Sequence, residues 1–361
     1  MAIVQKRINI GWEEMMKLAM RSLLLVAMYA FVVAVGMCLS QAADQKRKVI
    51  IAVGGVTGQM DKLVYAVALH RGFFKDEGID VESIDFNSGA KGLEAMIGGS
   101  ADVTQGGFGH VSELRARGIN LVAFAVFNRF PGFVIVIPKS RVGQIKSVAD
   151  LKGKTIGVSS PGSASQIFVA LALKSVGTQL DENSYVATGN GAGAMAALRS
   201  GSLDALSNND PNITALTESG DAVVLADSRT EADVKKYYGG DMAEAGFYAK
   251  DEWVNSHPFE AQAIANGMVR AMQWFDHATP EEIASSVPAE YYHGNKKFYE
   301  KVVAANIDGF KWSGILTSEA AKNAYDAIKA LQPELENKKI DLSKTYTNKF
   351  VIEARKKYPQ Q

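Results

Sequence analysis

The sequence predicts an α/β fold with two sheets, and three observations support this. From Lys48 onward, short apolar runs alternate with segments of helical periodicity, which is typical of a mainly parallel sheet. The alternation restarts with different lengths near Gln144, and amphipathic helices replace it after Trp253. The 361 residues are enough for about two domains.

The first block alternates strands with helices. We predict strands at 48–55, 79–86, 101–107, 120–127 and 132–138, because each is a short apolar or alternating run bounded by turn residues. We predict helices at 61–78, 89–99 and 110–118, and each of them ends in glycine, a common helix stop.

The second block repeats the scheme. Strands are predicted at 155–160, 185–189, 203–208, 222–227 and 245–250, with a helix at 166–177 after the first of them. The tail carries amphipathic helices such as 258–278 and 318–331. The two blocks form either two domains in series or one domain interrupted by the other. The strands 132–138 and 245–250 are the natural crossing points in the second case, since both are extended and precede helix starts.

The N-terminal region resembles an export signal. No charge occurs from Ser22 to Ala43, a basic flank precedes this run, and the small-residue ending "SQA" closes it. We therefore predict a signal peptide at residues 1–42, a mature chain that starts near Ala43, and a periplasmic location. An uncleaved anchor and a lipidated Cys38 are the alternatives, and translation starting at Met15, Met16 or Met20 is another.

Charge and cysteine content narrow the range of partners. Without residues 1–42 the chain keeps 35 basic and 37 acidic residues, a net charge of −2, which gives no attraction for nucleic acid or an anionic membrane. Cys38 is the only cysteine, so the mature chain forms no disulfide and has no thiol nucleophile.

The motifs give no support for an enzyme, a metal site or a cofactor. Gly153-Lys154-Thr155 lacks the earlier glycine of a nucleotide loop and precedes its strand instead of following it. The five histidines are scattered without metal-ligand spacing, and "GVSSP" lacks the final glycine of a nucleophile elbow. The run "TGNGAGA" has the wrong spacing for a dinucleotide fingerprint.

Glycine-rich loops are the more informative feature. Those at 54–59, 88–92, 104–109 and 188–194 each follow a strand and precede a helix. Open α/β sheets bind ligands at this edge. The run "SSPGSAS" likewise joins a strand to a helix start, where free N–H groups and the helix dipole favour an anion, although its serines also suit ordinary helix capping.

Four segments resemble a known family in order and spacing: "AVALHRGFFKDEGIDVE", "GLEAMIGGSADVTQGG", "IVIPKSRVGQIKSVADLKGKTIGV" and "AALRSGSLDALSNNDP". They are similar to the extracytoplasmic substrate-binding proteins of nitrate/sulfonate/taurine-type ABC importers and to the related thiamine-pyrimidine-synthase-like proteins. The resemblance covers residues 48–250 well and the helical tail loosely. The fungal pyrimidine synthases of that superfamily carry a cysteine-rich motif that the mature chain lacks, which counts against the enzymatic branch.

The resemblance implies a periplasmic-binding-protein type II fold with the second domain inserted in the first. Domain 1 would comprise residues 43–140 and 247–361, and domain 2 residues 141–246. The ligand would lie between them, and the closed, monomeric protein would deliver it to a membrane permease. A pyrimidine-precursor binding protein or synthase-like enzyme is the alternative, and a module that presents its ligand to a receptor is another.

We expect a small organic anion of the sulfonate, nitrate or taurine type, bound without cofactor or metal. Its charge would meet backbone donors at the two helix starts, and Phe108 or Phe247 would supply apolar contact. The residues predicted to bind the ligand are Gly55, Thr57, Gln59, Ser88, Gly89, Ala90, Gly107, Phe108, Arg129, Ser160, Gly162, Ser163, Asn190, Gly191, Asp210 and Phe247.

Overall fold

A computed structural model describes residues 47–178, 183–292 and 294–360, with residues 11, 12, 14–17, 19, 20, 22 and 28 ahead of them. The chain divides into two units, residues 1–47 and 48–361. The described residues of the first unit are helical apart from the last, which begins a strand. Most of the predicted signal, including its cleavage site, lies outside the described residues. Within the described part of the chain, no helix has the length and apolar character needed to cross a membrane.

The first sheet of the larger unit has the strand order β2-β1-β3-β10-β4. β1 pairs parallel with β3, whereas β10 runs antiparallel to both β3 and β4. The strands are β1 (Arg47–Gly54), β2 (Ile79–Phe86), β3 (Val103–Gly107), β4 (Leu121–Val126) and β10 (Ala245–Lys250).

The second sheet repeats this layout with the order β7-β6-β8-β5-β9. β6 pairs parallel with β7 and β8, and β5 runs antiparallel to β8 and β9. The strands are β5 (Val134–Pro138), β6 (Thr155–Val158), β7 (Ser184–Ala187), β8 (Ala205–Asn208) and β9 (Ala222–Asp227). In each sheet the antiparallel strand is the one by which the chain arrives from the other sheet.

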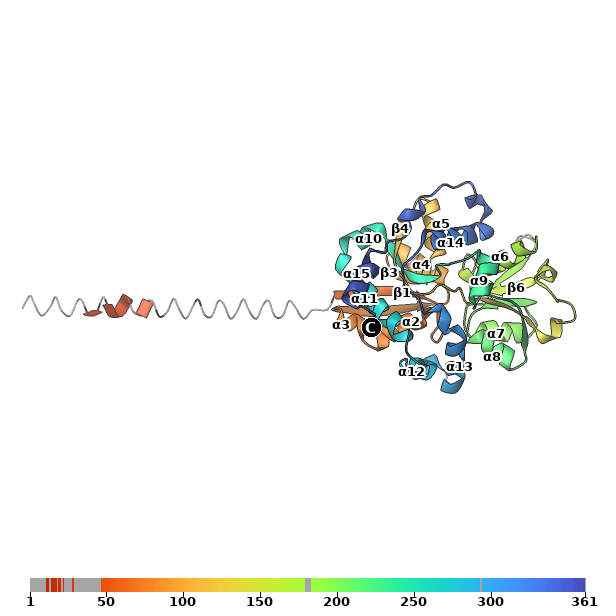
Figure 1. The fold of residues 1–361 in the computed structure, drawn as a ribbon, viewed down its shortest axis with the longest axis horizontal. Coiled ribbons are helices and arrows are strands. Elements are labelled where there is room, and N and C mark those ends of the chain that lie inside the picture. Colours follow the sequence, from red (N-terminus) through yellow and green to blue (C-terminus); the bar gives the residue numbers. More distant parts are fainter. Residues whose placement is uncertain are drawn as a thin grey trace, which may run out of the picture. The chain divides into compact units, whose positions relative to one another are not determined.

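The two sheets form two α/β lobes, and the second is inserted in the first. The chain leaves the first sheet after β4, builds the second from β5 to β9, and returns at β10 (Figure 1). The boundary that we predicted after residue 140 would leave β5 in the first domain, but β5 hydrogen-bonds within the second sheet. β5 is buried along its whole length, so its sequence does not reveal which sheet it joins.

Helices cover the sheets. Figure 1 shows α6 and α9 on one face of the second sheet and α7 and α8 on the other. The helices are α2 (Leu63–His70), α3 (Phe73–Asp76), α4 (Gly89–Ile97), α5 (Gly109–Ala116), α6 (Ala164–Ser175), α7 (Ala192–Arg199), α8 (Asn212–Glu218), α9 (Glu231–Tyr238), α10 (Asp251–Ser256), α11 (Pro258–Phe275), α12 (Pro280–Ser285), α13 (Lys296–Asn306), α14 (Ser318–Leu331) and α15 (Lys349–Lys357).

One predicted helix is divided in the structure. The segment 61–78 forms the 3₁₀ turn η1 (Met60–Lys62), α2 and α3. The break falls at Gly72, whose φ of 77° is left-handed and ends the α-helical path of α2.

An apolar core continues from one lobe to the other along α14. This helix packs against α5 of the first lobe and α6 of the second. Ile328 of α14 shares one buried cluster with Ala123 of β4 and Phe168 of α6. Because this contact is apolar and close-packed, the lobes are held together on the α14 side.

Candidate ligand-binding site

A cavity of about 30 Å³ lies between the lobes. All four glycine-rich loops contribute to its wall, and so does the segment after β6. The lining residues are Gly54, Asp61, Gly89, Gln105, Gly106, Gly107, His110, Phe133, Ser159, Ser163, Ala164, Asn190, Glu244 and Ala245. One water molecule requires about 10–15 Å³ of cavity volume, so the cavity has room for two or three water molecules.

The end of β1 passes very close to the start of α4. A β-carbon at Gly54 would lie 2.7 Å from the backbone nitrogen of Gly89, so only glycine fits there without a backbone shift. This close approach places the first turn of α4 at the cavity, and Gly89 lines the cavity wall.

The starts of α4 and α6 meet across the two lobes. Ser88 caps α4 by accepting a hydrogen bond from the backbone N–H of Lys91 at 3.3 Å, and its Oγ lies 2.8 Å from Oγ of Ser160. Ser163, the residue before α6, donates its hydroxyl to the carbonyl of Ser160 at 2.7 Å. The N-terminal ends of α4 and α6, which carry the positive ends of the helix dipoles, therefore lie at the cavity wall.

An amide relay also joins the lobes. Gln59 accepts from the backbone N–H of Val56 through Oε1 at 3.0 Å. Its Nε2 donates across the cleft to Oδ1 of Asn209 at 2.6 Å and to the carbonyl of Asn190 at 3.3 Å. The Val56 bond fixes the orientation of the Gln59 amide, and this orientation in turn fixes that of Asn209.

His110 makes a third connection. Its Nε2 lies 3.3 Å from the carbonyl of Gly162 and therefore donates to it, which leaves Nδ1 to accept from the hydroxyl of Tyr248 at 3.2 Å. Burial lowers the pKa of His110, so the neutral tautomer with the proton on Nε2 fits both contacts.

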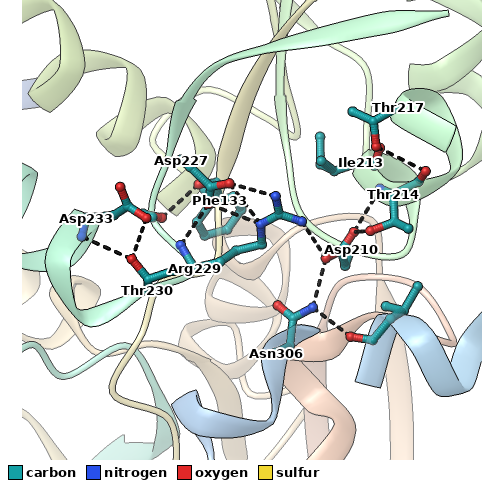
Figure 2. Close-up of polar contacts among 12 residues, drawn as sticks. Phe133, Asp210, Ile213, Thr214, Thr217, Asp227, Arg229, Thr230, Asp233 and Asn306 are labelled. Carbon is teal, nitrogen blue, oxygen red and sulfur yellow. Dashed lines mark hydrogen bonds and ion pairs between the residues drawn. The ribbon is translucent and has the colours of Figure 1, made fainter. Parts of the chain in front are cut away.

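A charged cluster joins the lobes beside the cavity (Figure 2). The carboxylate of Asp210 is fully buried and accepts from the backbone N–H and the hydroxyl of Thr214. Arg229 of the same lobe donates to it at 3.2 Å, and Asn306 of α13 in the first lobe donates at 2.8 Å. Arg229 also pairs with Asp227, and these two carboxylates hold the pKa of its guanidinium above the usual range.

Two acidic side chains, Glu244 and Asp61, form an acidic side of the cavity wall. Glu244 is 8% exposed, and backbone hydrogen bonds with Phe108 and Asn128 hold it against the first lobe. Burial raises the pKa of Glu244 to about 8, and the nearby carboxylate of Asp61 adds to this. Burial likewise raises the pKa of Asp61 to about 6, against the opposing charge of Lys62. No cluster of three metal-binding side chains occurs in the described part of the chain.

The structure divides the predicted site residues into three groups. Gly89, Gly107, Ser163 and Asn190 line the cavity. Gln59, Ser88, Ser160, Gly162 and Asp210 make hydrogen bonds between the lobes, and a β-carbon at Gly191 would lie 3.9 Å from Cγ1 of Val56 in the first lobe. Gly55, Thr57, Ala90, Phe108, Arg129 and Phe247 are outside the described lining of the cavity.

The third group has other roles. Phe108 and Phe247 are fully buried in apolar clusters, so their rings do not face the cavity. The guanidinium of Arg129 lies over the ring of Phe130, 4.5 Å from its centroid. Thr57 contacts Asp85 at an exposed position of the first lobe.

Ten lining residues were not in the sequence-based prediction, and four of them have ionisable or amide side chains: Asp61, Gln105, His110 and Glu244. Gln105 carried a usable signal, since it is a polar residue inside a strand of small and apolar residues. Asp61 and Glu244 carried none, because an acidic residue in a first helical turn or just before a strand is ordinarily solvated.

A family model described as NMT1/THI5 like matches residues 59–283, which hold most of the cavity lining and the whole second sheet. The chain belongs to the NMT1/THI5-like family. No curated protein matches it. This NMT1/THI5-like chain is similar to a solved protein from Bordetella bronchiseptica, with 39% identity over 87% of this chain and 99% of that one and a TM-score of 0.83.

More distant structures share the fold of this NMT1/THI5-like protein. The alkanesulfonate-binding protein SsuA from Xanthomonas axonopodis, bound to MOPS, has 21% identity over 83% of this chain and 98% of that one, with a TM-score of 0.65. The periplasmic nitrate-binding protein NrtA from Synechocystis has 14% identity over 86% and 89% of the two chains, with a TM-score of 0.66.

Proposed function

We propose that this protein is the extracytoplasmic solute-binding component of an ABC importer, and that it binds a small organic anion between its lobes without chemical conversion. The cavity carries this proposal, because both lobes line it and hydrogen bonds between the lobes surround it. The resemblance to sulfonate- and nitrate-binding proteins supports it.

The small volume of the cavity indicates how binding proceeds. A solute larger than about three water molecules cannot enter the cavity as it stands. The ligand therefore binds to a more open form, and closure then forms the contacts of Gln59, Ser160 and Asn306 around it. The closed protein, acting as a monomer, would present the ligand to the membrane permease.

Export is part of the proposal. We infer that residues 1–42 are removed and that the periplasmic protein begins at or near Ala43. N-terminal sequencing of the exported protein tests this, because a start at Met16 or earlier would contradict cleavage. A blocked N-terminus at Cys38 would indicate lipid anchoring instead.

Ligand-dependent closure is the test of function. The mature chain, residues 43–361, is mixed in turn with nitrate, ethanesulfonate and taurine, and its melting temperature and radius of gyration are measured. A ligand at 100 times its dissociation constant adds about 2.7 kcal/mol of stability. We expect a bound compound to raise the melting temperature and to reduce the radius in small-angle scattering. A ligand that is turned over, or one that binds at saturation without any compaction, would contradict the proposal.

A further inference from the structure

The side chain of Gln105 presents an unsatisfied acceptor to the cavity. It is 1% exposed, and its Nε2 donates to the backbone carbonyl of Asp61 at 3.2 Å. A carbonyl only accepts, so this bond fixes the amide with Oε1 on the other side. No partner for Oε1 occurs among the described residues, and Gln105 lines the cavity. A buried acceptor without a donor costs about 1–3 kcal/mol.

Two carboxyl groups face the same space. Glu244 lines the cavity, and its Oε1 lies 3.5 Å from the position that a β-carbon on Gly107 would occupy. Asp61 lines it as well; its Oδ1 is buried without a hydrogen-bond partner in the described part of the chain, although the side-chain amide of Asn209 is near enough to lower its pKa. Gln105, the ionised Asp61 and, once it loses its proton, Glu244 are three acceptors on one small cavity, and together they call for a group that offers several donors.

The neighbouring cations are engaged elsewhere. Lys62 donates its Nζ to the carbonyl of Gly55 at 3.1 Å and to Asp85 at 3.2 Å, and Arg229 is paired with Asp210 and Asp227. Histidine 110 is neutral in the tautomer described above. The charge of Lys62 offsets part of the desolvation of Asp61, but neither Lys62 nor Arg229 donates a hydrogen bond to Asp61 or Glu244.

We infer that the ligand carries a protonated nitrogen group, an ammonium or amidinium, which donates hydrogen bonds to Gln105, Asp61 and Glu244. The inference rests on the proposed function and specifies its ligand. The starts of α4 and α6 line the same cavity through Gly89, Ser163 and Ala164, and their backbone N–H groups suit an anionic group. The ligand class is thus a small zwitterion, with its nitrogen at the acidic side and its anionic group at the helix starts.

A change in the protonation of Glu244 on binding would indicate independently that the ligand carries a protonated nitrogen. Burial raises the pKa of Glu244 to about 8 in the free protein. An ammonium within about 4–6 Å favours the charged carboxylate, so binding lowers this pKa and releases a proton near neutral pH. A ligand with only an anionic group would have the opposite effect and would take up a proton.

Four matched compounds test the inference: taurine, which carries both charges, 2-hydroxyethanesulfonate without the amine, ethanolamine without the sulfonate, and ethylene glycol without either. β-Alanine and propionate extend the comparison to a carboxylate. Each is titrated into the mature protein by calorimetry in two buffers of different ionisation enthalpy, so that both affinity and proton exchange are obtained. The variants are Glu244→Gln and Gln105→Leu, and Glu252→Gln, an exposed residue of α10, is the control.

We expect the zwitterions to bind at least 10-fold more tightly than their amine-free counterparts and to release a proton. Glu244→Gln should abolish the release and, like Gln105→Leu, weaken zwitterion binding at least 10-fold, while Glu252→Gln binds like the wild type. Equal binding of 2-hydroxyethanesulfonate and taurine, in the wild type and in Glu244→Gln, would overturn the inference and leave the proposed function standing. If none of the compounds binds, both the proposed function and the inference fail.

Discussion

Replacing Glu244 by Gln should change how the stability of the free protein depends on pH. Glutamine keeps the shape of the side chain but has no carboxyl group that can titrate. In the folded protein the pKa of Glu244 is raised to about 8, whereas an unfolded chain has the ordinary glutamate value of 4.5. The folded state thus holds the proton more tightly than the unfolded state. This contribution to the free energy of unfolding is fully present below pH 4.5 and is lost as the pH rises through 8.

The magnitude follows from the two pKa values. One unit of pKa difference corresponds to about 1.4 kcal/mol, so the full shift represents about 5 kcal/mol. Between pH 5 and pH 8 the free energy of unfolding of the wild type should fall by about 3.5 kcal/mol more than that of Glu244→Gln. Asp61 titrates with a pKa of about 6, where Glu244 is still protonated, so the contribution of Asp61 should be common to both proteins.

Urea unfolding of both proteins at pH 5, 6, 7 and 8 gives the comparison. The infrared carbonyl band of a protonated carboxylic acid offers a second readout, since the wild type should show such a band at pH 7 that Glu244→Gln lacks. Parallel stability curves for the two proteins, together with identical infrared spectra, would refute the reasoning, because Glu244 would then titrate as an ordinary exposed glutamate.

Three further substitutions test the packing and the closure. Gly54→Ala should lower the free energy of unfolding in urea by about 1–3 kcal/mol, because the new methyl group would clash with the backbone of Gly89. Gly193→Ala, where the methyl group enters open space on α7, should not destabilise the protein, and equal stabilities of the two variants would contradict the close approach of β1 to α4. Asn306→Ala removes a hydrogen bond to a buried carboxylate, worth about 1.5–3 kcal/mol, and should enlarge the radius of gyration of the free protein, unlike exposed Asn255→Ala. Gly89→Leu should abolish ligand binding with an unchanged circular dichroism spectrum, and normal binding would place the ligand elsewhere.

Much of the fold was predictable because its signals are local. The first-block strands and the helix 318–331 appear where the sequence predicted them, since apolar runs, the alternation in β2 and amphipathic periodicity leave a direct pattern. The assignment of β5 to a sheet was not predictable, because pairing is a non-local property and an apolar strand fits either lobe. The break at Gly72 was missed because a glycine inside a helical pattern is often tolerated.

The site was predictable only where it depends on the backbone. The loops after the strands and the helix starts at Ser88 and Ser163 follow from chain order. The acidic side was missed because what distinguishes Glu244 is its burial, and this depends on contacts with residues more than 100 positions away, such as Asn128 and Phe108. Phe247 was predicted to contact the ligand because it lies near the loops, but its ring packs in the hydrophobic core.

Burial of Glu244 also links the charge of the ligand to closure. If the more open form leaves this carboxyl in water with an ordinary pKa, closing over it at pH 7 requires it to bind a proton, at a cost of about 3 kcal/mol. That cost alone disfavours the closed, empty protein about 300-fold relative to an uncharged cavity. A ligand with a protonated nitrogen removes the cost, because the carboxylate then stays ionised beside its counter-charge. The contacts of Gln59 and Asn306 stabilise closure whatever the cavity holds, whereas the acidic side makes closure depend on the ligand. The same residues would in this way provide both recognition and the signal that the site is filled.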